Sequence, residues 1–223
     1  MATEPISTTT PPTALTRDPA ASGPAVPAPA CRPAGLTAAT VRRLGVGLCA
    51  GAVAFAAGLA ASTAVQDPAS LWSHVGGLLF QGGLWGLLVV LHRTRATGDG
   101  RFGRGLLWTV AALLVPATVS SAVSLVAPPS ATGATWYLLL DVCWPLSMLG
   151  MAVIGVTIAA VGRYRGALRW WPMVAESWAL VTVPTVALAG PVAGGVVGTA
   201  HALFGYGVLG LLLARRPELT GRS

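Results

Sequence analysis

The stretch LGVGLCAGAVAFAAGLAASTA, residues 44–64, decides the fold class of this chain. It has no charged side chain, and at 1.5 Å per residue a helix of this length spans about 30 Å, the thickness of the hydrocarbon core of a bilayer. Further apolar segments of similar length follow at about 71–91, 105–127, 135–161, 173–190 and 194–214. The sequence therefore predicts an all-α polytopic membrane protein, a bundle of about six transmembrane helices within residues 41–216.

The composition agrees with an apolar solvent. Of the 223 residues, 54% are hydrophobic and 9% are charged, whereas a soluble domain carries roughly 25% charged residues. The mean hydropathy is +0.70. All 14 basic residues are arginine, and the chain contains neither lysine nor asparagine. Since the codons of lysine and asparagine are A-rich, this usage indicates a GC-rich, bacterial genome, and it weakens arguments from the abundance of glycine or arginine.

The two ends of the chain differ from the apolar part. Residues 1–40 are rich in proline, alanine, threonine and serine and show no periodic apolar pattern. Such a segment cannot bury enough apolar surface to offset the entropy of ordering, so we expect a disordered cytoplasmic tail. No apolar run follows Met1, which argues against a secretory signal. Residues 217–223 are expected to form a short cytoplasmic tail.

The arginines predict how the chain is threaded. They fall before the first span, between the second and third, between the fourth and fifth, and after the sixth. The remaining connections carry none, which is the alternation that the positive-inside rule produces for an even number of spans. Both termini are therefore expected in the cytoplasm, with the chain in the plasma (inner) membrane. The topology determinants nearest the spans are Arg42, Arg43, Arg93, Arg95, Arg101, Arg104, Arg163, Arg165, Arg169, Arg215 and Arg216.

Three alternative interpretations are weaker. The net charge of +7 does not indicate nucleic-acid binding, because arginines at helix ends meet anionic headgroups. The twin arginines Arg42-Arg43 before an apolar run resemble an export signal, but they follow a long tail and five more spans come after them. The stretch GDGRFG, residues 98–103, matches a dinucleotide-binding fingerprint, yet it lies in a short loop between two predicted spans and lacks the βαβ context.

Scarce ionisable groups define the candidate site. Asp141 and His201 are expected at nearly the same depth in the outer half of the membrane, with His74 and Gln81 on a neighbouring helix. Intramembrane ionisable residues usually face the bundle interior and often pair. We therefore predict that Asp141 faces His201, with His74 or Gln81 nearby, as a site that binds a solute or relays protons. The alternative is that Asp141 forms a structural pair or extends toward the outer interface of the membrane.

The other reactive side chains indicate no cofactor. Glu176 is expected at the cytoplasmic interface, paired with an arginine and favoured by the helix dipole. Haem ligation by His74 and His201 would need both at one depth, and they differ by several residues. Cys31, Cys49 and Cys143 are expected at different depths, so a disulfide is not predicted. No catalytic or metal-binding motif occurs, so neither a metal nor a cofactor is predicted.

Small residues on helix faces predict close packing, in a bundle or an oligomer. The glycines involved are Gly47, Gly51, Gly58, Gly82, Gly86, Gly194, Gly198, Gly207 and Gly210. Besides the lipid bilayer, the expected partner is a second copy of this chain or another protein. Either would pack against these glycine-rich helix faces to form a homo- or hetero-oligomer. The favoured function is a structural, interaction or assembly component of a bacterial inner membrane. A small-solute or proton-linked carrier is the alternative, and a membrane enzyme is disfavoured.

Overall fold

The structure is a computed structural model that describes residues 36–67 and 70–221, which contain helices and no strand. These described residues form one compact unit. Most of the predicted tail lies outside the described residues, as do Cys31 and the arginines Arg17, Arg32 and Arg222. The first helix begins at Ala38, capped by Thr37, whose side chain accepts a hydrogen bond from Thr40 N. The last three residues of the predicted tail are therefore helical.

Helices α1 (Ala38–Val65) and α2 (Leu71–Thr94) form the closest pair in the bundle. Ser70 caps α2 by accepting a hydrogen bond from Ser73 N. Glycines allow the two backbones to approach: a Cβ on Gly51 would lie 2.8 Å from Leu79 O. Gly51 therefore packs directly against the backbone of α2 inside the bundle. Only a residue without a side chain fits this helix–helix spacing.

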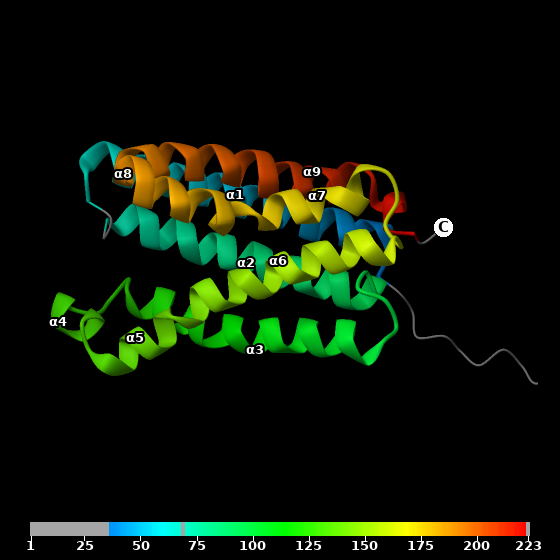
Figure 1. Ribbon diagram of the computed structural model, residues 1–223, viewed down its shortest axis with the longest axis horizontal. Helices are drawn as coiled ribbons and strands as arrows, with labels where there is room; N and C mark the ends of the chain where they lie inside the picture. Colours follow the sequence, from blue (N-terminus) through cyan, green and yellow to red (C-terminus); the bar gives the residue numbers. More distant parts are fainter. Residues whose placement is uncertain (1–35, 68–69, 222–223) are drawn as a thin grey trace, which may run out of the picture. The chain divides into compact units, whose positions relative to one another are not determined.

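The next helices are α3 (Arg101–Val123), the short α4 (Pro129–Thr132) and α5 (Thr135–Asp141), followed by α6 (Cys143–Val161). In Figure 1, α3 and α5 lie along one side of the bundle, and α6 crosses between α3 and α2. The fourth predicted span is broken between α5 and α6 at Val142. Pro145 explains the break, because it has no N–H to donate to the carbonyl of Asp141, four residues earlier.

The last part of the chain is a hairpin. It comprises α7 (Ala167–Glu176), α8 (Trp178–Ala202), the π-helix η1 (Leu203–Gly207), α9 (Val208–Arg215) and the 3-10 helix η2 (Pro217–Thr220). Gly190 interrupts α8 with φ 86° and ψ 171°, and beyond it the chain reverses. A Cβ on Gly194 would contact Val186, and Trp178 Nε1 donates to Gly198 O at 3.0 Å. The hairpin packs beside α1 and α6 (Figure 1).

Five helical segments among the described residues are long and apolar enough to cross a membrane. Four of them match the first four predicted spans, and the fifth, Ala167–Arg215, unites the last two in the hairpin. The prediction of an all-helical chain with several membrane-compatible helices is confirmed. Gly190 and Pro191, which the sequence placed between two spans, are the point where the hairpin turns.

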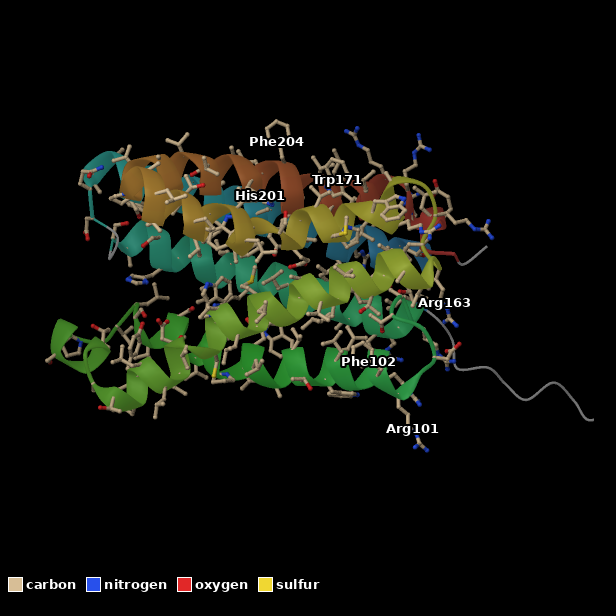
Figure 2. All side chains as sticks on the ribbon, viewed as in Figure 1. Arg101, Phe102, Arg163, Trp171, His201 and Phe204 are labelled. Carbon is tan, nitrogen blue, oxygen red and sulfur yellow. The ribbon has the colours of Figure 1, made fainter. Side chains whose placement is uncertain are left out.

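One end of the bundle collects the arginines. The described arginines all lie at helix ends or in loops that meet there: the start of α1, the α2–α3 loop, the α6–α7 loop and the end of α9. Figure 2 shows Arg101 and Arg163 at this end. Arg165 N donates to Leu219 O at 2.9 Å, so part of the predicted C-terminal tail packs on the bundle.

Asp99 links two loops at the arginine end. Arg95 Nη1 lies 2.7 Å from its carboxylate, and Arg163 Nη2 forms a second ion pair with it. Hydrogen bonds from Arg163 and then Arg95 hold the pKa of Asp99 below its ordinary value of 3.8. The α2–α3 loop and the α6–α7 loop are therefore joined by charge at the bundle surface.

Candidate functional site

A carboxyl group lies in the interior of the bundle, between the two arms of the hairpin. Tyr206 Oη donates a 2.6 Å hydrogen bond to Glu176 Oε2. Glu176 is 2% exposed and Tyr206 is 1% exposed. Burying a carboxyl group is costly unless it is hydrogen-bonded, and ionisable groups at such positions in membrane proteins usually serve a function. We name Glu176, Tyr206, Ser177 and His201 the hairpin polar cluster.

Both members of the pair sit at interruptions of regular helix. Glu176 is the last residue of the ten-residue α7, and Ser177 separates α7 from α8 with ψ 1°. Ser177 Oγ donates to Val174 O at 2.7 Å, a local bond that competes with helix continuation. Tyr206 belongs to the π-helix, a geometry that is rare and frequent at functional sites. The pair therefore joins the two points at which the arms of the hairpin depart from regular α-helix.

His201 extends the cluster. Its Nε2 lies 2.9 Å from Val174 O and 3.5 Å from Ser177 Oγ. A carbonyl oxygen can only accept a hydrogen bond, so Nε2 carries a proton in this contact. Figure 2 shows His201 at the hairpin and Phe204, from the adjacent π-helix, pointing away from the bundle. The imidazole thus donates to a carbonyl at the α7–α8 interruption that also accepts a hydrogen bond from Ser177 Oγ.

Close contacts between the arms fix this geometry. Trp171 Nε1 donates to Gly205 O at 3.0 Å, which satisfies a carbonyl of the π-helix. A Cβ on Gly205 would lie 2.9 Å from Ala175 Cα, so glycine is required for the arms to approach here. Phe80 packs edge-on against the Tyr206 ring, with 4.7 Å between centroids. Phe80 therefore covers the ring of Tyr206, the hydrogen-bond partner of Glu176, with apolar surface.

The predicted site residues are distributed differently. Asp141 is exposed at the end of α5, and no hydrogen bond or ion pair joins it to His201 in the described part of the chain. Gln81 is buried in α2 and donates to Ser121 Oγ at 2.7 Å. His74 is half-buried in the first turn of α2. Of the four, His201 alone belongs to the hairpin polar cluster, through its contact with Ser177 Oγ.

The expectation for Glu176 was wrong. It was placed about one turn into a helix starting near residue 173 and paired with an arginine at the interface. The helix instead begins at Ala167, so its tenth residue lies about 13 Å from the helix start. That depth removes Glu176 from the arginines and puts it opposite Tyr206. Tyr206 was missed, although its position between two glycines in LFGYG marks an unusual helix.

The described thiols and possible metal ligands are dispersed over the bundle. Across residues 36–67 and 70–221, no group of three or more histidine, cysteine, aspartate or glutamate side chains could hold a metal ion. Cys49 and Cys143 are both free thiols. His201, weighed as a haem ligand, uses Nε2 in its bond to Val174 O.

The chain was compared with known proteins to test for a shared family. No family model matches it. No curated protein and no solved structure matches it either.

Proposed function

We propose that this chain is an integral protein of a bacterial inner membrane that crosses it six times, with both termini in the cytoplasm. The arms of the hairpin, residues 167–189 and 191–215, are each about 35 Å long at 1.5 Å per residue, enough to span the hydrocarbon. The gathering of arginines at one end supports the assignment of that end to the cytoplasm.

Single cysteines introduced into a cysteine-free background test this topology. Gly100→Cys lies at the arginine end, while Ser130→Cys and Ala189→Cys lie in α4 and beside the hairpin turn. In intact cells, an impermeant maleimide should label positions 130 and 189 and should label position 100 only after lysis. Labelling of position 130 but not 189 would contradict six crossings and indicate a hairpin that does not reach the outer surface.

We further propose that the protein is a proton-linked carrier of a small solute. The observation that supports this function is the buried Glu176–Tyr206 pair between two helix interruptions. Protonation of a buried carboxyl removes its charge and changes which hydrogen bonds it can make. Because Glu176 and Tyr206 lie on opposite arms, proton binding would bias the packing of one arm against the other, and this is the coupling that a carrier needs.

Proteoliposomes containing a trapped pH-sensitive dye test the carrier. A potassium diffusion potential drives protons inward, and Glu176→Gln is compared with wild type. We expect faster acidification with wild type than with the variant or with protein-free vesicles. Tyr164→Phe is the matched control, because Tyr164 is also buried but bonds Thr94 Oγ1 at 2.9 Å, away from the cluster. Equal rates for wild type and Glu176→Gln would contradict the proposal.

An interaction role is the second candidate, and a groove on the α1–α2 face supports it. The groove has a volume of about 400 Å³. Small side chains of α1 line it together with Trp72 and Leu79 of α2, which are 67% and 55% exposed. The lining residues are Ala54, Ala57, Gly58, Ala61, Trp72, Val75, Gly76 and Leu79. Small-residue faces of this kind suit helix–helix packing in membranes.

Cysteine crosslinking distinguishes a dimer through this groove. In the cysteine-free background, Ala57→Cys should form a disulfide-linked dimer in native membranes if two copies meet there. Val115→Cys on α3, which is 53% exposed, serves as the control on another face. Equal crosslinking at both positions would indicate random collision rather than an interface.

A further inference from the structure

A pocket lies between α2 and α3, toward the arginine end of the bundle. It has a volume of about 330 Å³. The residues of each helix that form it recur at spacings of three and four, so each helix contributes one continuous face. They are Trp85, Leu88, Val89, His92, Arg93, Leu107, Trp108 and Ala111. We name it the α2–α3 pocket.

The part of the pocket farther from the arginine end is apolar. Trp85 precedes Arg93 by eight residues, which is about 12 Å along α2. Trp85 Nε1 donates to Thr118 Oγ1 at 3.2 Å, so its only polar group is satisfied within the protein. Val89 and Trp108 present their side chains to the surroundings, at 44% and 66% exposed. This wall suits a hydrocarbon chain, which makes no hydrogen bonds.

The mouth of the pocket is basic. His92 and Arg93 lie in the last turn of α2, and both are exposed. Arg104 comes three residues before Leu107 and four before Trp108, so it extends the same face of α3 by one turn toward the arginine end. The rings of His92 and Trp108 meet edge-on, with 5.6 Å between centroids, and link the two helices at the mouth.

The charge at this mouth is of one sign. None of the described residues that line the pocket is an aspartate or a glutamate. Residues 93–104 contain four arginines and one aspartate, Asp99, which forms an ion pair with Arg95. The pocket at the start of α1, by contrast, is lined by both Arg42 and Glu218. The α2–α3 pocket therefore combines positive charge at one end with apolar surface along the rest of its length.

We propose that the α2–α3 pocket binds an anionic phospholipid, with its phosphate at Arg93 and Arg104 and the first part of one acyl chain along Trp85 and Val89. A guanidinium group suits phosphate oxygens, which it can bind through two N–H groups. Basic pockets between membrane helices are a recurring way to bind anionic headgroups. A lipid fits better than an acidic protein segment, because the apolar wall runs along two helices that are membrane-compatible in length and hydropathy.

The site extends the membrane assignment made above. That the lipid comes from the cytoplasmic leaflet rests on the proposed topology, which places the arginine end in the cytoplasm. The preference of the mouth for a negative headgroup rests on Arg93, Arg104 and the absence of carboxylates among the described lining residues. It does not depend on proton transport.

Quenching of Trp108 fluorescence by brominated lipid tests the binding. The full-length protein is placed in phosphatidylcholine nanodiscs that contain an increasing fraction of phosphatidylglycerol brominated along one acyl chain, or of phosphatidylcholine brominated in the same way. The difference between wild type and Trp108→Phe isolates the signal of Trp108. We expect the brominated phosphatidylglycerol to quench at a lower mole fraction. Arg93→Gln and Arg104→Gln should each weaken this preference about fivefold, the effect of one basic side chain near an anionic surface.

Matched variants separate a binding site from the general charge of the arginine end. Arg215→Gln removes an arginine at the end of α9, which packs on α1 and α7, and should leave the preference at Trp108 unchanged. Arg93→Lys keeps the charge and should keep most of the preference even if Arg93→Gln lowers stability. Trp72, 67% exposed at the opposite end of α2, should be quenched equally by the two lipids.

Two results would overturn the proposal. Equal quenching of Trp108 by the two lipids, or an equal loss of preference with Arg215→Gln and Arg93→Gln, would show that the arginines act only as topology determinants. Loss of the preference with excess inorganic phosphate, at matched ionic strength, would show a phosphate site that needs no acyl chain.

The lipid site and the carrier can fail separately. Glu176→Gln should leave the lipid preference unchanged, because Glu176 does not line the α2–α3 pocket. An arginine-dependent lipid preference without any Glu176-dependent proton entry would keep the lipid site and reject the carrier. Glu176-dependent proton entry without a lipid preference would reject the lipid site and keep the carrier. Both leaflets of the nanodisc contain the same lipids, so the result is independent of the proposed topology.

Discussion

Tyr206 Oη lies 2.6 Å from Glu176 Oε2, and the two residues come from opposite arms of the hairpin. Both are buried, so the hydrogen bond is shielded from water and lipid. A buried hydrogen bond of this kind stabilises the folded state. When one partner is removed, the other is left buried and unpaired, and this lowers the free energy of unfolding.

Tyr206→Phe should therefore lower the free energy of unfolding by about 1–3 kcal/mol, because it leaves a buried carboxyl group without a partner. Glu176→Gln keeps an acceptor for Tyr206 and should cost less. Denaturation in detergent, followed by the loss of helical circular dichroism, measures both. The double variant should be less destabilised than the sum of the single changes; strict additivity would show that the two side chains act independently.

Gly190 should resist substitution for a purely backbone reason. Its φ of 86° and ψ of 171° belong to a region that is essentially restricted to glycine, while its built Cβ meets nothing within 4 Å. Gly190→Ala should therefore cost about 1–3 kcal/mol without any steric clash. Thermal unfolding of the variant beside Gly77→Ala, a helical glycine that also has open space around its Cβ, checks this. Equal melting temperatures would show that the hairpin turn tolerates another conformation.

Gly210 tests the packing of α9 on α1. A Cβ at this position would lie 2.6 Å from both Cys49 N and Gly45 O. Since these are backbone atoms, they cannot move without separating the helices, and Gly210→Ala should cost about 1–3 kcal/mol through overpacking. Gly105→Ala on α3, where the Cβ meets nothing, is the matched control. Denaturant titration should show a lower midpoint for the first variant, and a shared midpoint would refute the close approach.

Asp99 gives the chain a pH dependence at its arginine end. Its pKa is lowered in the folded state by hydrogen bonds from Arg163 and Arg95. A lowered folded pKa contributes stability above the ordinary value of 3.8, and this is lost as the pH falls below that value through the folded pKa. The melting temperature of wild type should therefore exceed that of Asp99→Asn at neutral pH.

The pH dependence and the salt dependence of this difference in melting temperature are the controls. The difference between wild type and Asp99→Asn should shrink as the pH falls below 3.8 through the lowered pKa of Asp99, where the carboxylate is protonated. It should also shrink with added salt, because the ion pairs are exposed and screened. A difference that persists in acid would show that Asp99 acts through its shape rather than its charge.

Hydropathy and charge by themselves determined the class of this protein. Apolar length decides whether a helix can lie in a bilayer, and arginine distribution predicts its threading; both depend on local sequence and solvent. The helices of the first four predicted spans, the close packing at Gly51 and the turn at Gly190 follow from such local signals. Gly47 and Gly82, which the sequence also placed on packing faces, have nothing within 4 Å of a built Cβ. Pro145 likewise explains the break beside Asp141 through a missing N–H.

The tertiary structure alone decided the site. Glu176 pairs with Tyr206 because α7 begins at Ala167 and the hairpin sets the arms in one register. When a helix begins a few residues earlier than expected, each side chain lies a full turn or more further from the helix start. The sequence specifies such helix boundaries poorly. Asp141 and His201 share an expected depth, but α5 packs on α3 while His201 lies in the hairpin. Which residues meet depends on how distant helices pack, and depth along one helix does not determine it.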